Sequence, residues 1–370
     1  MIYKEYGKTG KKVSAVGFGG MRFDITKDER ENIDLVHYAA SKGINYFDTA
    51  PRYCNDQSEF IMGRALSLLK REDYYVSTKL MPSEGKCKQD FIDAVKKSLD
   101  RLKSDYIDFY HIWCLREMAH YELAMKEGMQ YDALLECQQM GLIKHIVCSS
   151  HQPGSEIKKI ADDGKVEGIL MGINILNSRY RWKGVEACVA NNLGIVAMNP
   201  LSGGVIPQNE DKLQYLSRGS DTPTQAALRF CISSPITVTL NGFAEKAHID
   251  MACDIADGCT PYTQAELDGI SKSLGENMNS LCTGCGYCLK GCPVEINIPA
   301  YMQFYNRKLM WNESNEALKS QLQGHEYNWG TLVGSPRASE CIECGACEEA
   351  CTQHLDIIDR LRYINENIDI

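Results

Sequence analysis

The chain has 370 residues, of which 44% are hydrophobic, and a formal net charge of −9. This length accommodates one large domain with a substantial core and one small domain. The negative charge makes nucleic acid and anionic membranes poor partners. We find neither an apolar run of about 18 residues nor a basic-then-apolar start, so we expect no membrane span and no secretory signal. The 17 cysteines suit a reducing cytoplasm, where we expect the protein to act.

Residues 1–12 predict a two-strand hairpin with its turn at residues 8–10, placed across the bottom of the domain that follows. Eight short apolar segments then predict strands. They are Val13–Phe18, Ile44–Phe47, Tyr74–Thr78, Tyr106–Ile112, Ile143–Cys148, Ile169–Asn174, Ile195–Met198 and Ile236–Leu240. Amphipathic stretches that predict helices lie between them, among them Asp28–Lys42, Asp90–Lys103 and Tyr121–Met140.

A glycine directly precedes three of these strands, at Gly43, Gly141 and Gly194. We expect each of them to end a helix in the left-handed conformation, which other residues resist. Eight strands that alternate with helices over about 250 residues predict a closed (β/α)8 TIM barrel, an α/β fold, over residues 1–270. An open doubly wound sheet is the alternative, but no G-x-G-x-x-G follows the first strand.

Residues 271–370 predict a small ferredoxin-like domain of helices and loops. Its first ten residues are polar and predict a linker. A helical stretch follows at about Ile298–Leu322, and Ile357–Ile370 predicts a last helix that packs on the barrel.

Two cysteine runs in this region share the spacing C-x2-C-x2-C-x3-C, which is typical of ligands to [4Fe–4S] clusters. In such runs the fourth cysteine usually binds the other cluster, so two runs hold each other together. A pair of zinc sites is the alternative, but zinc sites pair cysteines two by two. We therefore expect two [4Fe–4S] clusters that share eight ligands: Cys282, Cys285, Cys288 and Cys292 of the first run and Cys341, Cys344, Cys347 and Cys351 of the second.

Three reactive side chains follow two neighbouring strands of the predicted barrel. Asp48 and Tyr53 come after the second strand, and Lys79 ends the third. In such barrels the reactive groups lie at the carboxyl ends of the strands. An ammonium beside a phenol favours the phenolate, and a tyrosine tuned in this way can protonate a developing alkoxide.

Several motifs in order resemble the aldo-keto reductase superfamily, over residues 1 to about 255. They are residues 1–24 (MIYKEYGKTGKKVSAVGFGGMRFD), FDTAPRY, STK, DYIDFY and NPLSGG. With the cysteine runs, the chain resembles the branch that carries a ferredoxin-like extension. The resemblance implies that Tyr53 is the general acid, Lys79 its activator and Asp48 the partner of the lysine.

The family's fourth catalytic residue, a histidine, has no direct match. Trp113 stands at its position, and His111 lies two residues earlier on the same face of the strand. His111 either bonds Lys79 or Tyr53 from below or is an ordinary core histidine. Trp113 would form a wall of the substrate pocket, and His151 would reach the pocket mouth as a second proton donor.

The resemblance also implies positions for NADPH or NADH. Ser149, Ser150 and Asn174 would hold the nicotinamide amide, and Met198 replaces the usual aromatic residue under the ring. Lys246 is the one cation after the last strand, so a preference for the 2′-phosphate is not supported. The remaining cofactor contacts would come from the end of the first strand and from the NPLSGG loop, at Gly20, Met21, Arg22, Leu201, Gly203 and Gly204.

Three functions fit these features. The first is a reductase of a carbonyl or conjugated group in a small organic substrate, with Tyr53 as proton donor and with NAD(P)H or the clusters as the electron source. The second is a reductase without nicotinamide, which a ferredoxin or flavodoxin partner supplies through the clusters. The third is a non-catalytic electron-transfer subunit, against which the intact set of Asp48, Tyr53 and Lys79 argues.

Overall fold

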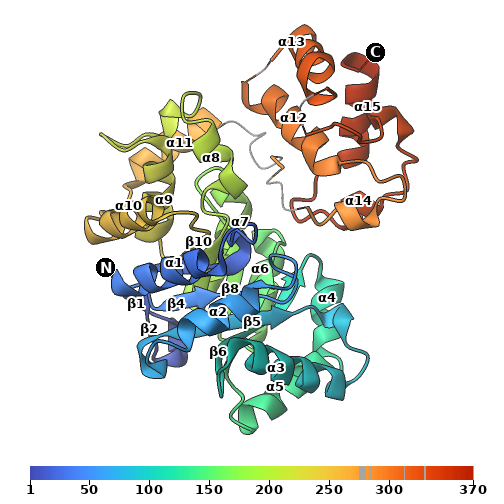
Figure 1. The fold of residues 1–370 in the computed structure, drawn as a ribbon. Coiled ribbons are helices and arrows are strands. Elements are labelled where there is room, and N and C mark those ends of the chain that lie inside the picture. The colour runs from blue at the N-terminus through green and yellow to red at the C-terminus, as the bar shows by residue number, and fades with distance from the viewer. Residues whose placement is uncertain (275–280, 283–285, 312, 329–330, 370) are drawn as a thin grey trace. The chain divides into compact units, whose positions relative to one another are not determined.

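The computed structural model describes residues 1–274, 281–282, 286–311, 313–328 and 331–369 (Figure 1). The chain forms two compact units. The first consists of Met1–Leu201 and Leu216–Thr263, and the second of Ser202–Tyr215 and Gln264–Ile370. The expected domain limit at residue 270 falls inside helix α11 (Gln264–Leu274), which also covers the first four residues of the expected linker.

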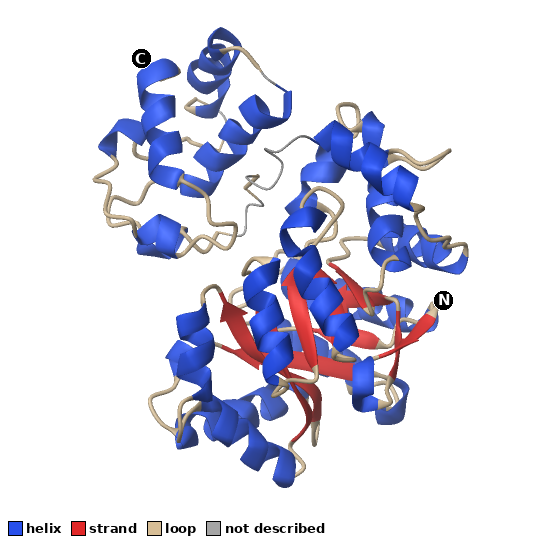
Figure 2. Cartoon of the chain, turned by 180° about the vertical axis from the view of Figure 1, so that it is seen from behind, coloured by secondary structure: helices blue, strands red, loops and turns tan. Residues whose placement is uncertain are grey.

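The first unit is a closed barrel of eight parallel strands in the order β10-β3-β4-β5-β6-β7-β8-β9, which confirms the predicted TIM barrel. Figure 2 shows these strands enclosed by helices. The limits of all eight expected strands lie within three residues of the observed ones. The strands are β3 (Val16–Gly19), β4 (Tyr46–Asp48), β5 (Tyr75–Leu80), β6 (Ile107–Leu115), β7 (Ile143–Ser150), β8 (Gly168–Gly172), β9 (Gly194–Met198) and β10 (Val238–Asn241).

The predicted start of the strand Val13–Phe18 was wrong, because this segment belongs to two elements. Strand β2 (Lys12–Ser14) pairs antiparallel with β1 (Tyr3–Glu5) and completes the predicted hairpin, and the barrel strand β3 starts only at Val16. Two strands of different sheets follow each other here with one residue between them. A continuous apolar run does not reveal such a change of sheet.

Tyr6 of the hairpin closes the bottom of the barrel. Its side chain is fully buried and lies in a cluster with Tyr46 and Phe109. The backbone of Gly194 passes so close that a β-carbon there would lie 2.1 Å from the Tyr6 ring. Gly194 is therefore a glycine because of this close approach. Its predicted left-handed conformation was wrong, since Asn192 takes that role with φ of 50°.

Gly43 and Gly141 do have the predicted left-handed backbone, with φ of 88° and 79°. The segment Tyr121–Met140 contains two helices instead of one, because Gly128, with φ of 73°, interrupts it. The helices of the first unit are α1 (Glu29–Ser41), α2 (Ser58–Leu66), α3 (Lys88–Leu102), α4 (Met118–Met125), α5 (Gln130–Gln139), α6 (Gly154–Asp163), α7 (Ser178–Ala190), α9 (Pro223–Ser233) and α10 (Lys246–Asp257).

Strand β6 contains a bulge near its carboxyl end. Ile112 pairs with Cys148 of β7, but Leu115 pairs with Ser150, so β6 has one residue more than its neighbour. Cys114 takes φ of 60° within this bulge. A bulge of this kind turns the following side chains away from the regular alternation. It lies directly after Trp113 and thus at the rim where the site was expected.

In the second unit, the described residues form helices and loops around one apolar core. Helix α8 (Val205–Gln208) comes from the barrel sequence, and the others follow α11. They are α12 (Ile298–Trp311), α13 (Asn315–Gln321), α14 (Ala346–Glu349) and α15 (Ile357–Asn367). Leu361 and Ile364 of the last helix are buried in the core of this unit.

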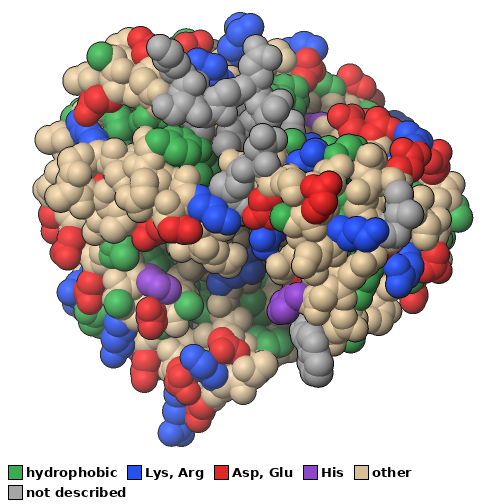
Figure 3. All heavy atoms as spheres, turned by 90° about the horizontal axis from the view of Figure 1, so that it is seen from above, with side chains coloured by type: hydrophobic (Ala, Val, Ile, Leu, Met, Phe, Trp, Pro, Cys, Tyr) green, Lys and Arg blue, Asp and Glu red, His purple; other side chains and the backbone are tan. Residues whose placement is uncertain are grey.

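The described surface carries charges of both signs. Figure 3 shows acidic and basic side chains interspersed among uncharged ones on one face. Within the described residues, every helix is too short or too polar to cross a membrane.

Candidate functional site

A buried ion pair lies at the carboxyl ends of two neighbouring strands. Asp48 ends β4 and pairs in register with Ser77 of β5, two residues before Lys79. The Nζ atom of Lys79 donates to Oδ1 of Asp48 over 2.5 Å, and the Ser77 hydroxyl donates to Oδ2 over 2.6 Å. Lys79 is 0% exposed and Asp48 2%. The ammonium is thereby fixed in one position.

Tyr53 lies over this pair. It follows β4 in a loop where Arg52 and Cys54 both have positive φ, which is costly for residues other than glycine. The Nζ atom of Lys79 is 5.2 Å from the centre of the Tyr53 ring. Trp113 packs edge-on against the same ring with 5.8 Å between the ring centres. The structure therefore brings four expected site residues together, with Trp113 as a buried wall.

Burial and ion pairing act on Lys79 in opposite directions. Removal from water lowers the pKa of the Lys79 ammonium, and the charge and hydrogen bond of Asp48 raise it. Burial is the larger effect, so the lysine holds its proton less tightly than a lysine in water. An ammonium of this kind stabilises a nearby phenolate and returns a proton readily.

His111 lies beside the pair. Its backbone is the register partner of Lys79 between β5 and β6, and its side chain is fully buried. The distance from Nε2 to Oδ2 of Asp48 is 3.9 Å, too long for a hydrogen bond. Burial, reinforced by the Lys79 cation, lowers the pKa of His111 to about 4. At neutral pH the imidazole is therefore uncharged, so it contributes shape and dipoles to the site but no cation.

This histidine makes the barrel sensitive to acid. In the unfolded chain its pKa is about 6.5, so the unfolded state binds the proton first as pH falls. The stability that a neutral His111 contributes is complete above about pH 6.5 and is lost as pH falls toward 4. Between about pH 7.5 and about pH 5, we expect the wild type to lose about 2 kcal/mol more unfolding free energy than His111→Phe.

Urea unfolding followed by far-UV circular dichroism at both pH values measures this difference. The exposed His248 provides the surface control, because its 3.2 Å contact with Glu245 is open to water and exposed ion pairs contribute little to stability. His248→Asn should lose as much free energy as the wild type. Equal losses in the wild type and His111→Phe would show that folding does not lower the pKa of His111.

The residues expected to hold the nicotinamide amide are buried at the ends of β7 and β8, but they bond their own chain. The Ser149 hydroxyl accepts from the backbone N–H of Cys114 over 2.8 Å, and Ser150 donates to the carbonyl of Leu115 over 3.3 Å. Asn174 donates to the carbonyl of Asn199 over 2.9 Å and accepts from the N–H of Leu176. These bonds order the rim, and a nicotinamide amide would share these atoms with them.

The other expected cofactor residues lie at several places. Met198 is half-buried at the end of β9, and Leu201 is the last residue of that part of the first unit. The loop beyond has a strained backbone: Asn199 and Ser202 have φ of 58° and 53°. Gly203 and Gly204, with φ of 69° and 103°, belong to the second unit.

The end of the first barrel strand is built around close contacts. The carbonyl of Gly20 accepts a 2.8 Å hydrogen bond from Ser58, and a β-carbon at Gly20 would lie 2.6 Å from that hydroxyl. Met21 and Arg22 are exposed, and the stem of Arg22 covers Gly242, which follows β10.

The expected cation of the adenosine side has another partner. The Nζ atom of Lys246 lies 5.1 Å from the centre of the Tyr38 ring. Cation–π contacts of this length are favourable. Lys246 would therefore have to give up its contact with Tyr38 in order to bind a phosphate.

Sequence reasoning missed three buried residues at this rim. Ser77 was detectable, because residues two apart share a strand face and Lys79 was already assigned. Arg181 is fully buried and donates to the carbonyls of His151 and Gly172 over 2.8 Å each, which ties the ends of β7 and β8 together. Gln152 is 1% exposed, and neither polar atom of its amide has a partner among the described residues. The His151 side chain is buried at 4% exposure.

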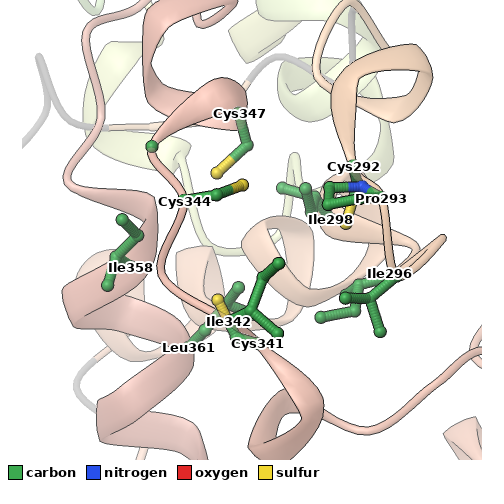
Figure 4. A pocket seen from close by; sticks show the side chains of 12 residues that line it. Cys292, Pro293, Ile296, Ile298, Cys341, Ile342, Cys344, Cys347, Ile358 and Leu361 are labelled. Carbon is green, nitrogen blue, oxygen red and sulfur yellow. The ribbon is translucent and has the colours of Figure 1, made fainter.

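Four cysteines surround one hollow in the second unit. Cys341, Cys344 and Cys347 of the second run line it together with Cys292, the fourth cysteine of the first run (Figure 4). Its walls are apolar side chains such as Ile298 and Leu361. This is the exchange of the fourth cysteine that the spacing predicts for a cluster pair.

The other described cysteines of the two runs lie in the core of the same unit. Cys282 and Cys288 of the first run and Cys351, the fourth of the second, are each between 8% and 9% exposed. Cys285 lies outside the described residues. Within the described residues, no three His, Cys, Asp or Glu side chains are arranged around a single metal ion. Thiols spaced around a hollow suit a [4Fe–4S] cluster, in which each iron atom binds one cysteine thiolate.

Comparison with known proteins agrees with this architecture. The model of the aldo/keto reductase family matches residues 15–272, and that of a 4Fe-4S dicluster domain matches residues 281–355. Of the curated relatives, a probable voltage-gated potassium channel subunit beta from Arabidopsis thaliana is 35% identical over 125 residues, which are 31% of this chain and 38% of the relative. An uncharacterised oxidoreductase from Bacillus subtilis is 29% identical over 218 residues, 56% of this chain and 67% of the relative.

The chain thus spans well under half of the first of these relatives and two thirds of the second. Solved structures show the same fold. An aldo-keto reductase from Bacillus halodurans in its holo form superposes with a TM-score of 0.62 at 24% identity, over 74% of this chain and 96% of that one. An aldo-keto reductase from Klebsiella pneumoniae in complex with NADPH gives 0.61 at 18% identity with the same coverage. Since its family model covers most of the chain, this protein belongs to the aldo/keto reductase family.

Proposed function

We propose that the barrel reduces a carbonyl or conjugated group of a small organic substrate and that Tyr53 donates the proton. The observation that carries this proposal is the buried pair of Asp48 and Lys79 beneath the Tyr53 ring. A purely structural ion pair does not need a phenol above it at the carboxyl rim, where barrels of this kind hold their reactive groups. Perturbed buried charges of this sort are frequent at functional sites.

The proton would move from the Tyr53 hydroxyl to the oxygen or carbon that becomes electron-rich during reduction. The cation of Lys79 stabilises the phenolate that remains, and Asp48 holds the cation in place. Trp113 excludes water on one side of the phenol. His111 stays neutral, so the Lys79 cation faces no second positive charge from that side.

We further propose that the second unit binds two [4Fe–4S] clusters. The four thiols around one hollow, with the fourth cysteine exchanged between the runs, support this assignment. Such clusters supply one-electron transfer. Cys344 is exposed and Ile342 is 62% exposed, so this face offers an electron partner, such as a ferredoxin or a flavodoxin, access to the thiols.

NADPH or NADH would supply a hydride at the barrel rim, held by Ser149, Ser150 and Asn174. A solved relative in complex with NADPH supports this source. The bonds that these three residues make within the chain, and the position of Lys246 over Tyr38, are the observations that support a second candidate. In that candidate an electron partner feeds the barrel through the clusters without nicotinamide.

Anaerobic titration of the cluster-loaded protein with NADPH and with NADH distinguishes these functions. Nucleotide fluorescence reports binding, and visible absorbance reports cluster reduction in the same sample. We expect binding of at least one nucleotide, because the rim keeps the amide and hydroxyl groups that the family fold places there. Iron and sulfide analysis of the same sample should give about eight of each per chain for two cubes.

Binding with loss of cluster absorbance would show that nicotinamide and clusters share one electron path. Binding without that loss would leave a hydride-transferring barrel beside clusters with a separate role. Absence of binding for both nucleotides would refute the nicotinamide function and support the partner-fed reductase.

A further inference from the structure

The loop that carries Tyr53 has a strained backbone. Four of its residues have positive φ: Arg52 (71°), Cys54 (52°), Asn55 (53°) and Asp56 (63°). This conformation is unfavourable for residues with a β-carbon, and least so for Asn and Asp. The two residues that flank Tyr53 therefore carry most of the strain. Such a backbone persists only where contacts with the surrounding structure fix it.

Arg52 connects this loop to another segment of the barrel rim. Its backbone N–H donates to the Asp56 carboxylate over 2.8 Å, which closes the loop on itself. Its guanidinium forms an ion pair with Glu84, which lies in the turn Pro82–Glu84 after β5. A second contact of the loop is weaker, because it is made by the Cys54 thiol, 3.4 Å from the carbonyl of Gly20, and thiols are weak donors.

Glu84 is itself fixed to the segment that follows Lys79. Its other carboxylate oxygen accepts from the N–H of Met81 over 3.0 Å, and its own N–H donates to the Met81 carbonyl over 3.1 Å. Met81 comes only two residues after Lys79. The next residue, Gly85, is packed so tightly that a β-carbon there would lie 2.6 Å from the Phe91 ring. The ion pair therefore joins a strained loop to a well-packed turn.

We propose that the ion pair of Arg52 and Glu84 positions Tyr53 for proton donation. Arg52 directly precedes Tyr53, and Glu84 is bonded to the chain just beyond Lys79, so the pair fixes the phenol ring relative to the ammonium. Without the pair the strained loop would relax and the ring would leave this place. This inference rests on the proposed function of Tyr53, and it makes Arg52 and Glu84 positioning residues.

The exposure of the pair separates its effect on stability from its effect on the reaction. The Arg52 side chain is 51% exposed, and ion pairs open to water contribute little to stability. A displacement of about 1 Å at a reacting group can nevertheless lower a rate by about 10²-fold. Variants of the pair should therefore remain folded and still react more slowly.

Fluorine NMR of the full-length, cluster-loaded protein labelled with 3-fluorotyrosine tests the position of the ring without a substrate. The resonance that is lost in Tyr53→Phe belongs to Tyr53. In both Arg52→Gln and Glu84→Gln we expect this resonance to move toward that of fluorotyrosine in the urea-unfolded chain, because the ring leaves Lys79 and Trp113. Arg52→Lys keeps the charge and should keep the resonance close to its wild-type position.

Arg64 is the matched control. It lies in the last turn of α2, where its partly exposed guanidinium pairs with Glu29 of α1. Arg64→Gln removes the same charge from another ion pair and should leave the Tyr53 resonance unchanged. An unchanged resonance in either variant of the proposed pair, or an equal shift in Arg64→Gln, would overturn the proposal.

Rates distinguish a positioning role from a general disturbance of the barrel. Initial rates are measured with 4-nitrobenzaldehyde as a probe carbonyl and with the electron donor that the nucleotide titration identifies. Arg52→Gln should lower kcat about tenfold. In the Tyr53→Phe background it should change the remaining rate by less than about twofold, because no proton donor is left to position.

Equal factors in the two backgrounds would overturn the positioning role. Wild-type turnover in Tyr53→Phe would instead contradict the proposed function. The fluorine resonance would then still decide whether the ion pair holds the ring.

Discussion

Replacement of Tyr53 by Phe is expected to lower turnover by about 10²–10⁴-fold, the usual contribution of a positioned general acid. The ring would stay between the Lys79 ammonium and the edge of Trp113, because both contacts involve ring carbons. Only the proton and the oxygen that carries it would be lost. Initial rates with any substrate that the wild type reduces measure the effect, and visible absorbance should show unchanged clusters.

Tyr75→Phe is the matched control. Tyr75 begins β5 at the opposite end of the barrel, where its ring packs against the bottom cluster around Tyr6. The control removes the same hydroxyl from a similar half-buried ring, so its turnover should equal that of the wild type. Equal turnover in Tyr53→Phe and the wild type would refute the assignment of Tyr53 as proton donor.

The barrel and its ion pair were predictable because local patterns determine them. Strand ends can be located from short apolar runs, and parallel strands of one barrel direct their carboxyl ends to one rim. Asp48 and Lys79 each lie within one residue of such an end, so their proximity follows from the fold class. The same reasoning places His111 on the inner face, and the register confirms it beside Lys79.

Contacts between distant segments were not predictable in this way. The bulge at Cys114 depends on the pairing of β6 with β7, and the burial of Arg181 depends on two carbonyls from other strands. The close approach of Tyr6 to Gly194 joins the hairpin to β9 across most of the barrel sequence. In each case the residue looks ordinary in its own neighbourhood, and its role comes from its partner.

The cysteine runs are intermediate between these cases. Their spacing predicts the exchange of the fourth ligand, since loops of two residues can direct only neighbouring thiolates to one cube. The surroundings of each cluster follow from tertiary packing instead. Arg360 and Arg362 are two residues apart with equal charge, yet one is buried and the other exposed. That difference depends on which side of α15 faces the core.

Replacement of Lys79 by Met is expected to destabilise the barrel by about 3–5 kcal/mol and to abolish turnover, because it leaves the Asp48 charge buried without its cation. Ser77 would remain as a donor, but one neutral hydroxyl does not replace the positive charge of the lysine ammonium. Protonation would neutralise this buried charge. The loss of unfolding free energy in urea should therefore become smaller as the pH is lowered.

The double variant Asp48→Asn/Lys79→Met separates stability from catalysis. Asparagine keeps an acceptor for the Ser77 hydroxyl and carries no charge, so most of the lost unfolding free energy should return. Turnover should remain absent, because no cation would lie next to the Tyr53 ring. A double variant as unstable as Lys79→Met would show that packing of the lysine stem, and not the buried charge, causes the loss. A double variant that regains turnover would show that Tyr53 acts without Lys79, which would contradict the proposed proton donation.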